Sequence, residues 1–360
     1  MQPSSDTTRP RPGEELDAAR IQGFLRQSLP EFAGPSGTLR IRQFPGGASN
    51  LTYLLQSGDR ELVLRRPPFG TKARTAHDMG REFSVLRNLH AVFPYCPKPL
   101  VYCDDPEIVG EPFFLMERQR GVILRRDLPD GFELPPAQAK ALCRKLLDVQ
   151  LELHRIDYQS AGLGDLGRPQ GYVKRQVEGW SKRYRASRTD DVPDNAALMS
   201  WLLEHMPAES TAASIIHNDY KFDNVVLEER AGEWRVRGVL DWEMATIGNP
   251  LMDLGCSLAY WIEAGDPPPM LAARMLPTHL PGMMSRSEVV AYYAALSGRD
   301  VSDFRYYYVF GLFRLAVIVQ QIYFRYVRGQ TADPRFAGFG PLGTSLARNA
   351  EAIAAGTRTL

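Results

Sequence analysis

The first third of the chain alternates between helical and strand-like spacing of its apolar residues. Residues 16–29 repeat apolar side chains at helical intervals. Three strand-like stretches follow, TLRIRQF, NLTYLLQ and ELVLRR, and PGGAS and SGDR between them are typical of turns. Residues 76–90 return to helical spacing, and KPLVYCD and EPFFLMER add two more strands. This pattern predicts a small antiparallel sheet with one main helix.

Beyond Gly121 the apolar spacing is mostly helical, as in AQAKALCRKLLDVQLELHRI. IIHNDY, NVVLEE and WRVRGVLDWE interrupt it as short strands or strand-flanked loops. The most membrane-like run, which starts at Tyr306, is broken by Arg314 and Arg325, so we expect a buried helix and no membrane span.

These patterns predict an α+β fold in two lobes, because 360 residues exceed the usual size of one compact core. We assign residues 1–15 to a flexible tail and 16–116 to a β-rich nucleotide-binding lobe. Residues 117–121 are the predicted hinge, and 122–360 form a larger, mainly helical lobe for catalysis and acceptor binding.

Composition narrows the classes of function. The 43 basic and 42 acidic side chains nearly balance, which argues against nucleic-acid binding as the main role. The four cysteines form no CxxC pair and are expected to be reduced thiols. The amino terminus has no apolar signal region, so a cytoplasmic location is expected.

The segment HNDYKFDN concentrates polar groups between two apolar stretches. His217, Asp219 and Asn224 fall at the intervals of the kinase catalytic loop, and Asp241 follows seventeen residues later in VLDWE. Carboxylate and amide oxygens are ligands that Mg²⁺ prefers. An isolated HxD turn is more often a capped loop, but the ordered set favours a phosphoryl-transfer site.

With VLRRPP, REFSVLRNL, FFLMERQRG and LDWEMATIGNPLMDLG, this segment resembles the aminoglycoside phosphotransferase and choline kinase-like family, within the protein-kinase-like fold. The resemblance spans residues from about 38 to 261 and is closest to the kinase-like domains associated with acyl-CoA dehydrogenases. It implies an ATP- and Mg²⁺-dependent phosphotransferase acting on a hydroxyl of a small molecule. A functional link to an acyl-CoA dehydrogenase is also implied.

The resemblance assigns roles to residues of the loop. Asp219 is the expected catalytic aspartate, which orients the acceptor hydroxyl and takes its proton. Asn224 and Asp241 are the expected metal ligands. His217 is expected to hold the loop in shape, and Lys221 matches a phosphate-directed lysine of protein kinases.

The resemblance also implies a nucleotide site in the first lobe. Gly46, Gly47 and Ser49 lie in a glycine turn whose backbone N–H groups can approach phosphates. Arg65 stands where the parent fold has a lysine, with Glu82 as its helix partner. Arginine offers a bidentate fork instead of a point charge. A surface ion pair without a ligand is the alternative for these two residues.

Strand alternation places Val63 and Arg65 on one face of ELVLR and Leu62 and Leu64 on the other. If the two leucines pack under the helix, Arg65 faces the ligand.

The segment FFLMERQRG is expected to join the lobes. Met116 is the expected gatekeeper, and the backbones of Glu117 and Gln119 are candidates to bind adenine.

Three polar residues are expected to have structural roles. Asp223 is predicted to cap the loop or point to solvent, Asp253 to support the loop, and His154 to be a packed histidine.

The acceptor is expected to differ from an aminoglycoside, because antibiotic kinases of the family gather acidic residues around a polycation. Here KRQVEGWSKRYRASR is basic; most such runs are solvated helix faces, and an anionic acceptor such as a hydroxyacyl-CoA is the other interpretation. A catalytically silent nucleotide-binding regulatory module is the alternative function. A protein kinase is disfavoured by the absence of an APE segment.

Overall fold

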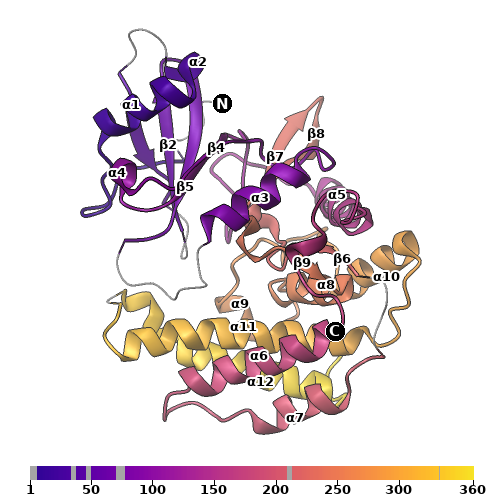
Figure 1. Ribbon diagram of the computed structural model, residues 1–360. Helices are drawn as coiled ribbons and strands as arrows, with labels where there is room; N and C mark the ends of the chain where they lie inside the picture. The colour runs from indigo at the N-terminus through magenta and orange to yellow at the C-terminus, as the bar shows by residue number, and fades with distance from the viewer. Residues whose placement is uncertain (1–5, 34–37, 46–49, 70–77, 209–212, 332) are drawn as a thin grey trace. The chain divides into compact units, whose positions relative to one another are not determined.

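The computed structural model describes residues 6–33, 38–45, 50–69, 78–208, 213–331 and 333–360. The chain divides into two compact units (Figure 1). Unit 1 comprises Met1–Arg120 and Gly238–Glu243, and unit 2 comprises Gly121–Arg237 and Met244–Leu360. Unit 1 therefore takes in a short segment that the sequence pattern assigned to the helical lobe.

Unit 1 is built on a five-stranded antiparallel sheet in the order β1-β2-β3-β5-β4. The strand spacing in the sequence predicted all five strands, which are β1 Arg40–Gln43, β2 Leu51–Ser57, β3 Arg60–Arg66, β4 Pro99–Cys103 and β5 Phe113–Glu117. Gly58 begins the turn between β2 and β3 with φ of +57°, a conformation that glycine adopts without steric cost.

Helices cover both faces of this sheet. On one face, Leu62 and Leu64 pack in a core with Ile21 and Leu25 of α1 (Ala18–Ser28). The short helices α2 (Pro30–Ala33) and α4 (Pro106–Val109) contribute Phe32 and Val109 to the same core.

Helix α3 (Met79–Leu89) lies on the opposite face, where its Phe83 ring is 6.1 Å from Phe114. Arg65 is opposite Phe114 in the β3–β5 register and shares that face. The helix over Leu62 and Leu64 is therefore α1, not the predicted main helix.

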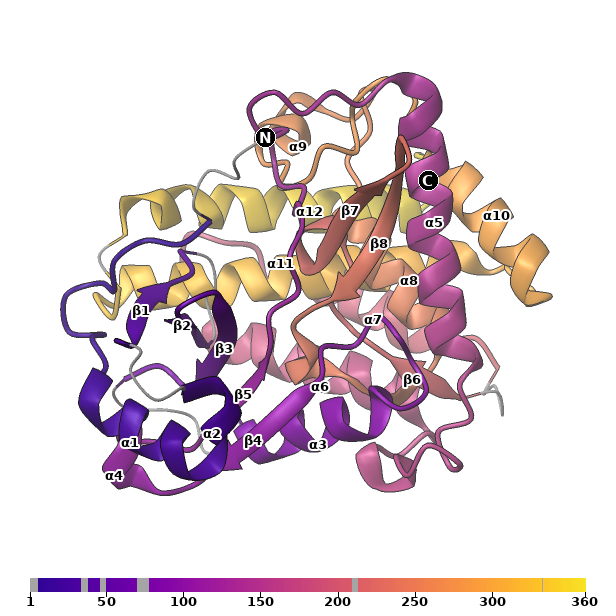
Figure 2. The same cartoon turned by 90° about the horizontal axis from the view of Figure 1, so that it is seen from above.

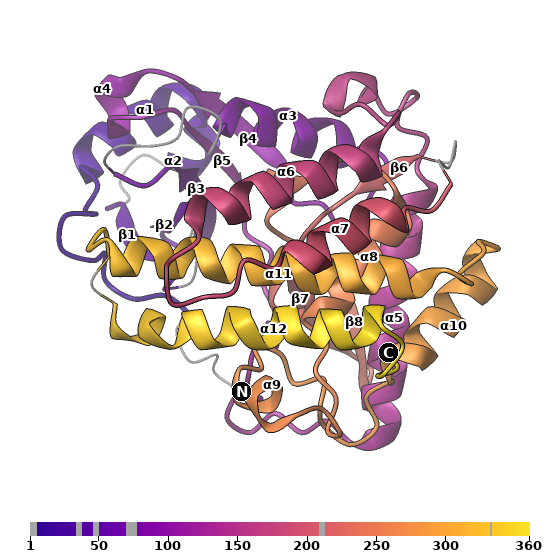
Figure 3. The same ribbon diagram turned by 90° about the horizontal axis from the view of Figure 1, so that it is seen from below.

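Unit 2 is mainly helical, as the apolar spacing predicted (Figure 3). Its helices are α5 Pro136–Arg155, α6 Tyr172–Ser187, α7 Ala196–Glu204, α8 Pro250–Ala259, α9 Pro268–Ala272, α10 Arg286–Ser297, α11 Phe304–Val327 and α12 Phe339–Ala354. Short 3-10 turns lie at Gly164–Leu166, Phe222–Asn224, Trp242–Met244 and Pro334–Gly338.

Two small pairs of strands accompany these helices. β6 (Ser214–Ile216) pairs antiparallel with β9 (Thr246–Gly248), and β7 (Val225–Arg230) pairs with β8 (Glu233–Val239) beside α5 (Figure 2). The catalytic-loop segment lies between β6 and β7.

Helices α8 and α11 pack through their backbones. A Cβ on Gly311 would lie 2.2 Å from the Gly255 carbonyl oxygen, and one on Gly255 would lie 2.2 Å from the Tyr307 carbonyl oxygen. Helix α11 is long and apolar enough to span a membrane, but 67% of its most apolar stretch is buried against the rest of the protein. It therefore packs as the predicted core helix.

Candidate active site

Asp253 organises the start of the catalytic loop. Its carboxylate accepts the backbone N–H groups of Asn218 at 2.6 Å and His217 at 3.4 Å. Asn218 has φ of +64°, a left-handed conformation that few side chains adopt. The fully buried carboxylate at the first turn of α8 therefore stabilises a strained turn immediately before Asp219.

The Asp253 carboxylate has its own buried partners. His154 Nε2 lies 3.0 Å and Gln150 Nε2 3.1 Å from Oδ2, and the His154 Nδ1 contacts the Tyr293 hydroxyl at 2.8 Å. Burial raises the pKa of Asp253, but the hydrogen bond from His154 and the neighbouring imidazoles more than offset it, so the carboxyl titrates below its usual range. Asp253 supports the loop and His154 is a packed histidine, as the sequence predicted.

Three loop residues fix Asp219. The Asn224 amide donates to the Asp219 Oδ2 at 2.8 Å and to its backbone carbonyl at 2.9 Å, and the Lys221 ammonium pairs with the same Oδ2. His217 is fully buried, and its Nδ1 accepts the Asp219 N–H at 3.2 Å. The sequence-predicted residues of this loop thus lie together, with His217 and Asn224 orienting Asp219.

Lys221 lies between two carboxylates. Besides Asp219, its ammonium is 3.4 Å from Asp223 Oδ1 and 5.1 Å from the centre of the Tyr260 ring. Burial lowers the pKa of Lys221, and the adjacent Asp219 more than offsets this effect, so the lysine remains charged. Its contact with phosphate stays a prediction.

Asp223 does not point to solvent as the sequence suggested. Its side chain is 20% exposed, its Oδ1 accepts no hydrogen bond, and burial raises its pKa. The spacing of the loop could not reveal that the carboxylate turns inward toward Lys221.

Asn224 has the chemistry of a magnesium ligand. Its amide nitrogen binds Asp219, whereas its amide oxygen accepts no hydrogen bond within the described residues. That oxygen is the kind of hard donor that Mg²⁺ prefers. Among the described residues, no group of three or more His, Cys, Asp or Glu side chains is placed to hold a metal ion, so any magnesium would depend on amide and phosphate oxygens as well.

In unit 1, Arg65 is surrounded by carboxylates. Its guanidinium pairs with Glu82 at 3.0 Å, with Asp241, and with Glu243 at 3.4 Å. The Arg65 and Glu82 side chains are only 10% and 3% exposed, so this is not a surface ion pair. Burial lowers the pKa of Arg65, but the three carboxylates raise it further. Arg65 thus pairs with Glu82 of α3, its predicted helix partner.

The acidic members of this cluster carry signs of strain. Burial and the adjacent Asp241 raise the pKa of Glu82 to about 7, despite the pairing with Arg65. Asp241 has φ of +68°, and the Glu243 carboxylate also accepts a hydrogen bond from the Asn50 amide at 2.6 Å. Unfavourable backbone geometry at a non-glycine residue is typical of functional sites.

The predicted adenine contacts lie at the end of β5. Met116 is 9% exposed and opposite Val63, on the face that carries Arg65. The Glu117 N–H donates to the Lys98 carbonyl at 2.9 Å, so only the Glu117 carbonyl stays a candidate. The Gln119 N–H makes no hydrogen bond within the described chain. Gly46, Gly47 and Ser49 lie outside the described residues.

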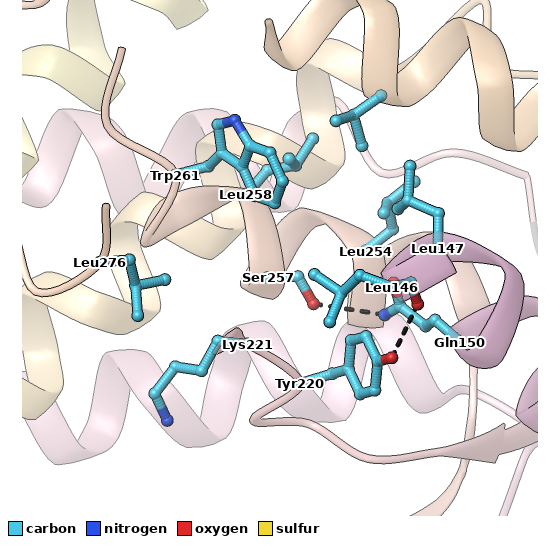
Figure 4. Close-up of a pocket in the computed structure, with 11 residues that line it drawn as sticks. Leu146, Leu147, Gln150, Tyr220, Lys221, Leu254, Ser257, Leu258, Trp261 and Leu276 are labelled. Carbon is cyan, nitrogen blue, oxygen red and sulfur yellow. Dashed lines mark hydrogen bonds between the residues drawn. The ribbon is translucent and has the colours of Figure 1, made fainter. Parts of the chain in front are cut away.

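A small pocket lies behind the catalytic loop (Figure 4). Its lining is mostly apolar, and its polar member Gln150 hydrogen bonds to Ser257 at 3.2 Å. The Tyr220 hydroxyl donates to the Leu146 carbonyl at 2.7 Å, and the Lys221 amine points away. This pocket belongs to the support of the loop.

Sequence reasoning missed two residues near the loop. Arg314 of α11 was interpreted only as a break in an apolar run, and Tyr260 at the end of α8 was not singled out. A lone arginine in an otherwise apolar helix was the available signal, because charged side chains are seldom fully buried without a partner.

The site and fold define a phosphotransferase. Residues 40–277 match the profile of the phosphotransferase enzyme family, so the chain belongs to this family. Acyl-CoA dehydrogenase family member 11 of Pongo abelii is 34% identical over 334 residues, which are 91% of this chain and 42% of that protein. The chain thus spans about two fifths of the length of such curated relatives.

Solved structures agree with this assignment. A Ralstonia eutropha protein described as a candidate aminoglycoside phosphotransferase is 30% identical, with a TM-score of 0.78 over 95% of this chain and 99% of that one. Choline kinase of Cryptosporidium parvum shares the fold at 13% identity, with a TM-score of 0.64 over 94% and 97% of the two chains.

A complex of an aminoglycoside phosphotransferase with GDP and kanamycin also shares the fold at 14% identity, with a TM-score of 0.61 over 92% and 98%. The kinase-like α+β fold and the family expected from the motifs are confirmed.

Proposed function

We propose that the chain transfers the γ-phosphoryl group of ATP to a hydroxyl of a small molecule, with Mg²⁺. The observation that carries this proposal is the fixed Asp219 carboxylate, which Asn224 and Lys221 orient from within one loop. Phosphoryl transfer requires mainly positioning and charge neutralisation, and such a preoriented base supplies the positioning.

In the proposed step, the acceptor oxygen bonds to the γ-phosphorus while the bond from phosphorus to the bridging oxygen breaks. ADP leaves with that electron pair, and the hydroxyl proton passes to the Asp219 carboxylate. Bound Mg²⁺ would neutralise charge on the phosphates. Asn224 in unit 2 and Asp241 in unit 1 are each proposed as ligands, and Arg65 as the phosphate-binding group.

Asp219→Asn tests the assignment. We expect nucleotide binding to persist and turnover to fall by several decades, roughly 10³-fold or more, because the amide cannot accept the proton. The measurement is incubation with ATP, Mg²⁺ and a metabolite extract, followed by mass detection of new phosphate esters. Asp190→Asn, at an exposed aspartate, is the matched control. Unimpaired turnover in Asp219→Asn rules out the proposed base.

The proposed acceptor is a hydroxylated metabolite such as a hydroxyacyl-CoA. The basic residues of α6 support an anion better than a polycationic aminoglycoside. The relatives named as acyl-CoA dehydrogenases support a working link to such an enzyme. Four buried free cysteines fit a cytoplasmic site of action.

A catalytically silent nucleotide-binding module is the second candidate. Its support is Arg65, which replaces a lysine and is already paired with Glu82, Asp241 and Glu243. The ATP and metabolite assay separates the two functions: nucleotide binding without new phosphate esters in the wild-type chain favours the silent module.

A further inference from the structure

Helix α11 contains a buried cation without a carboxylate partner. Arg314 is 3% exposed, and no carboxylate of the described residues lies within ion-pair distance of its guanidinium. Its Nη2 is 3.3 Å from the Met244 sulfur, and the Cys256 thiol is a second soft neighbour. Sulfur is a weak acceptor, so the charge is poorly compensated. Burial of such a group costs free energy that the fold itself does not recover.

A second guanidinium meets the same aromatic ring. Arg314 lies 5.1 Å and Arg183 4.6 Å from the centre of the Trp180 ring. Arg183 is exposed and forms no ion pair with any described residue. Burial and the charge of Arg314 lower the pKa of Arg183. Two like charges beside one indole favour a negative group near them.

This pair of arginines lies beside the catalytic loop. Met244, which contacts Arg314, accepts a hydrogen bond through its carbonyl from the Asn218 amide at 3.0 Å. Burial lowers the pKa of Arg314, and Cys256, Tyr260 and Asp219 more than offset this effect. The Cys256 thiol, with a pKa raised to about 11, is neutral at physiological pH. Asp219 is the carboxylate among the groups that raise the pKa of Arg314.

The backbone packing of α8 and α11 fixes this position. Gly311 allows the two helices to touch, and Arg314 follows three residues later on α11. The guanidinium is thereby held beside Met244, next to the catalytic loop and beyond ion-pair distance of Asp219. A molecule that contacts both groups needs an anionic group for Arg314 and a hydroxyl for Asp219.

We propose that Arg314, Arg183 and Trp180 form a subsite for an anionic group of the acceptor, which makes the substrate class a hydroxylated anion. This inference rests on the proposed phosphotransferase function. The guanidinium plane suits bidentate binding of a carboxylate or a phosphate. The anion is the carboxylate of a free hydroxy acid or a phosphate of a CoA thioester, and both chemistries satisfy the same pair of arginines.

The test is titration calorimetry without ATP. The probes are 3-hydroxybutyrate, 3-hydroxybutyryl-CoA and the neutral butane-1,3-diol. We expect at least one anion to bind and the diol not to bind. Competition by acetate identifies the carboxylate as the bound group, whereas competition by CoA identifies its phosphates. Equal binding of the diol, or binding of neither anion, overturns the subsite.

Variants separate binding from folding. Arg314→Met keeps an apolar stem of similar length and removes the charge. We therefore expect anion binding to weaken by about tenfold or more, with an unchanged or higher Tm. Arg325→Met, at an exposed arginine of the same helix, should change neither. Arg183→Gln changes an exposed side chain and so creates no cavity in the core. It should also weaken anion binding. Unchanged binding in both Arg314→Met and Arg183→Gln contradicts the proposal.

Asp219→Asn distinguishes this inference from the proposed function. The variant should lose turnover while anion binding that depends on Arg314 persists, because the guanidinium and not the base holds the anionic group. If the wild-type chain forms no phosphate ester but binds the anions through Arg314, the proposed function fails while the anion subsite stands.

Discussion

The charge clusters of the two units differ in the sign of their surplus. In unit 1, the single guanidinium of Arg65 contacts the carboxylates of Glu82, Asp241 and Glu243. Three carboxylates share this one guanidinium, and burial together with the adjacent Asp241 raises the pKa of Glu82. Such a surplus favours a cation.

In unit 2 the cations differ in their pairing. Lys221 pairs with Asp219 and Asp223, whereas Arg314 and Arg183, which both lie at the Trp180 ring, have no carboxylate of the described residues within ion-pair distance. These two guanidinium groups favour an anion. The comparison indicates that each unit is prepared for a partner of the opposite sign, so the strongest tests change one cluster and leave the other intact.

The largest expected effect on the free energy of unfolding is that of removing the Lys221 ammonium, which lies between two carboxylates. Lys221→Met leaves Asp219 and Asp223 close together and about four-fifths buried, without a compensating charge. We expect a loss of roughly 3–5 kcal/mol in the free energy of unfolding, since a buried pair is broken from one side. Urea denaturation at pH 7 measures it.

A second substitution provides the control for Lys221→Met. Adding Asp223→Asn should restore part of the stability, because only one carboxylate then lacks a partner. A Lys221→Met variant as stable as the wild type would show that the lysine does not hold the two carboxylates in place.

Gly311→Ala is expected to have an intermediate effect. The new methyl group would lie 2.2 Å from the Gly255 carbonyl, and neither backbone can move without separating α8 from α11. We expect a loss of roughly 1–3 kcal/mol, as for other overpacked cores, together with weaker binding of anions at Arg314. The control is Gly23→Ala in α1, where a new Cβ would meet open space. Gly329→Ala is unsuitable because Gly329 has φ of +69°, which alanine rarely adopts.

The sequence predicted the catalytic loop well because its chemistry depends on neighbouring residues. The intervals of HNDYKFDN placed Asp219, Lys221 and Asn224 in one turn, and strand alternation placed Arg65 on the face of Val63. The family resemblance also predicted that Asp253 supports this turn.

Local patterns could not predict features that depend on long-range packing. Strand spacing does not say which helix covers a sheet face, and α1 rather than α3 packs on Leu62 and Leu64. Side-chain direction in a tight turn is equally hidden, so Asp223 was expected to cap the loop or point to solvent, and its contact with Lys221 was not foreseen. The position of Arg314 depends on the contact between α8 and α11 at Gly255 and Gly311. These two glycines are 56 residues apart in the sequence.

The smallest expected effect concerns pH and the negative cluster of unit 1. Burial raises the pKa of Glu82 from its usual 4.5 to about 7. Between these values the folded chain binds a proton that the unfolded chain has released, so this group's contribution to stability is full below pH 4.5 and is lost as pH rises through 7. We expect wild-type stability to fall relative to Glu82→Gln by roughly 1–2 kcal/mol between pH 5 and pH 7. Thermal unfolding of both proteins across this range measures the difference in stability, and Glu82→Gln serves as the reference because Gln cannot ionise. If the difference in stability shrinks or stays constant as pH rises, Arg65 fully compensates the ionised Glu82. Unit 1 then has no negative surplus.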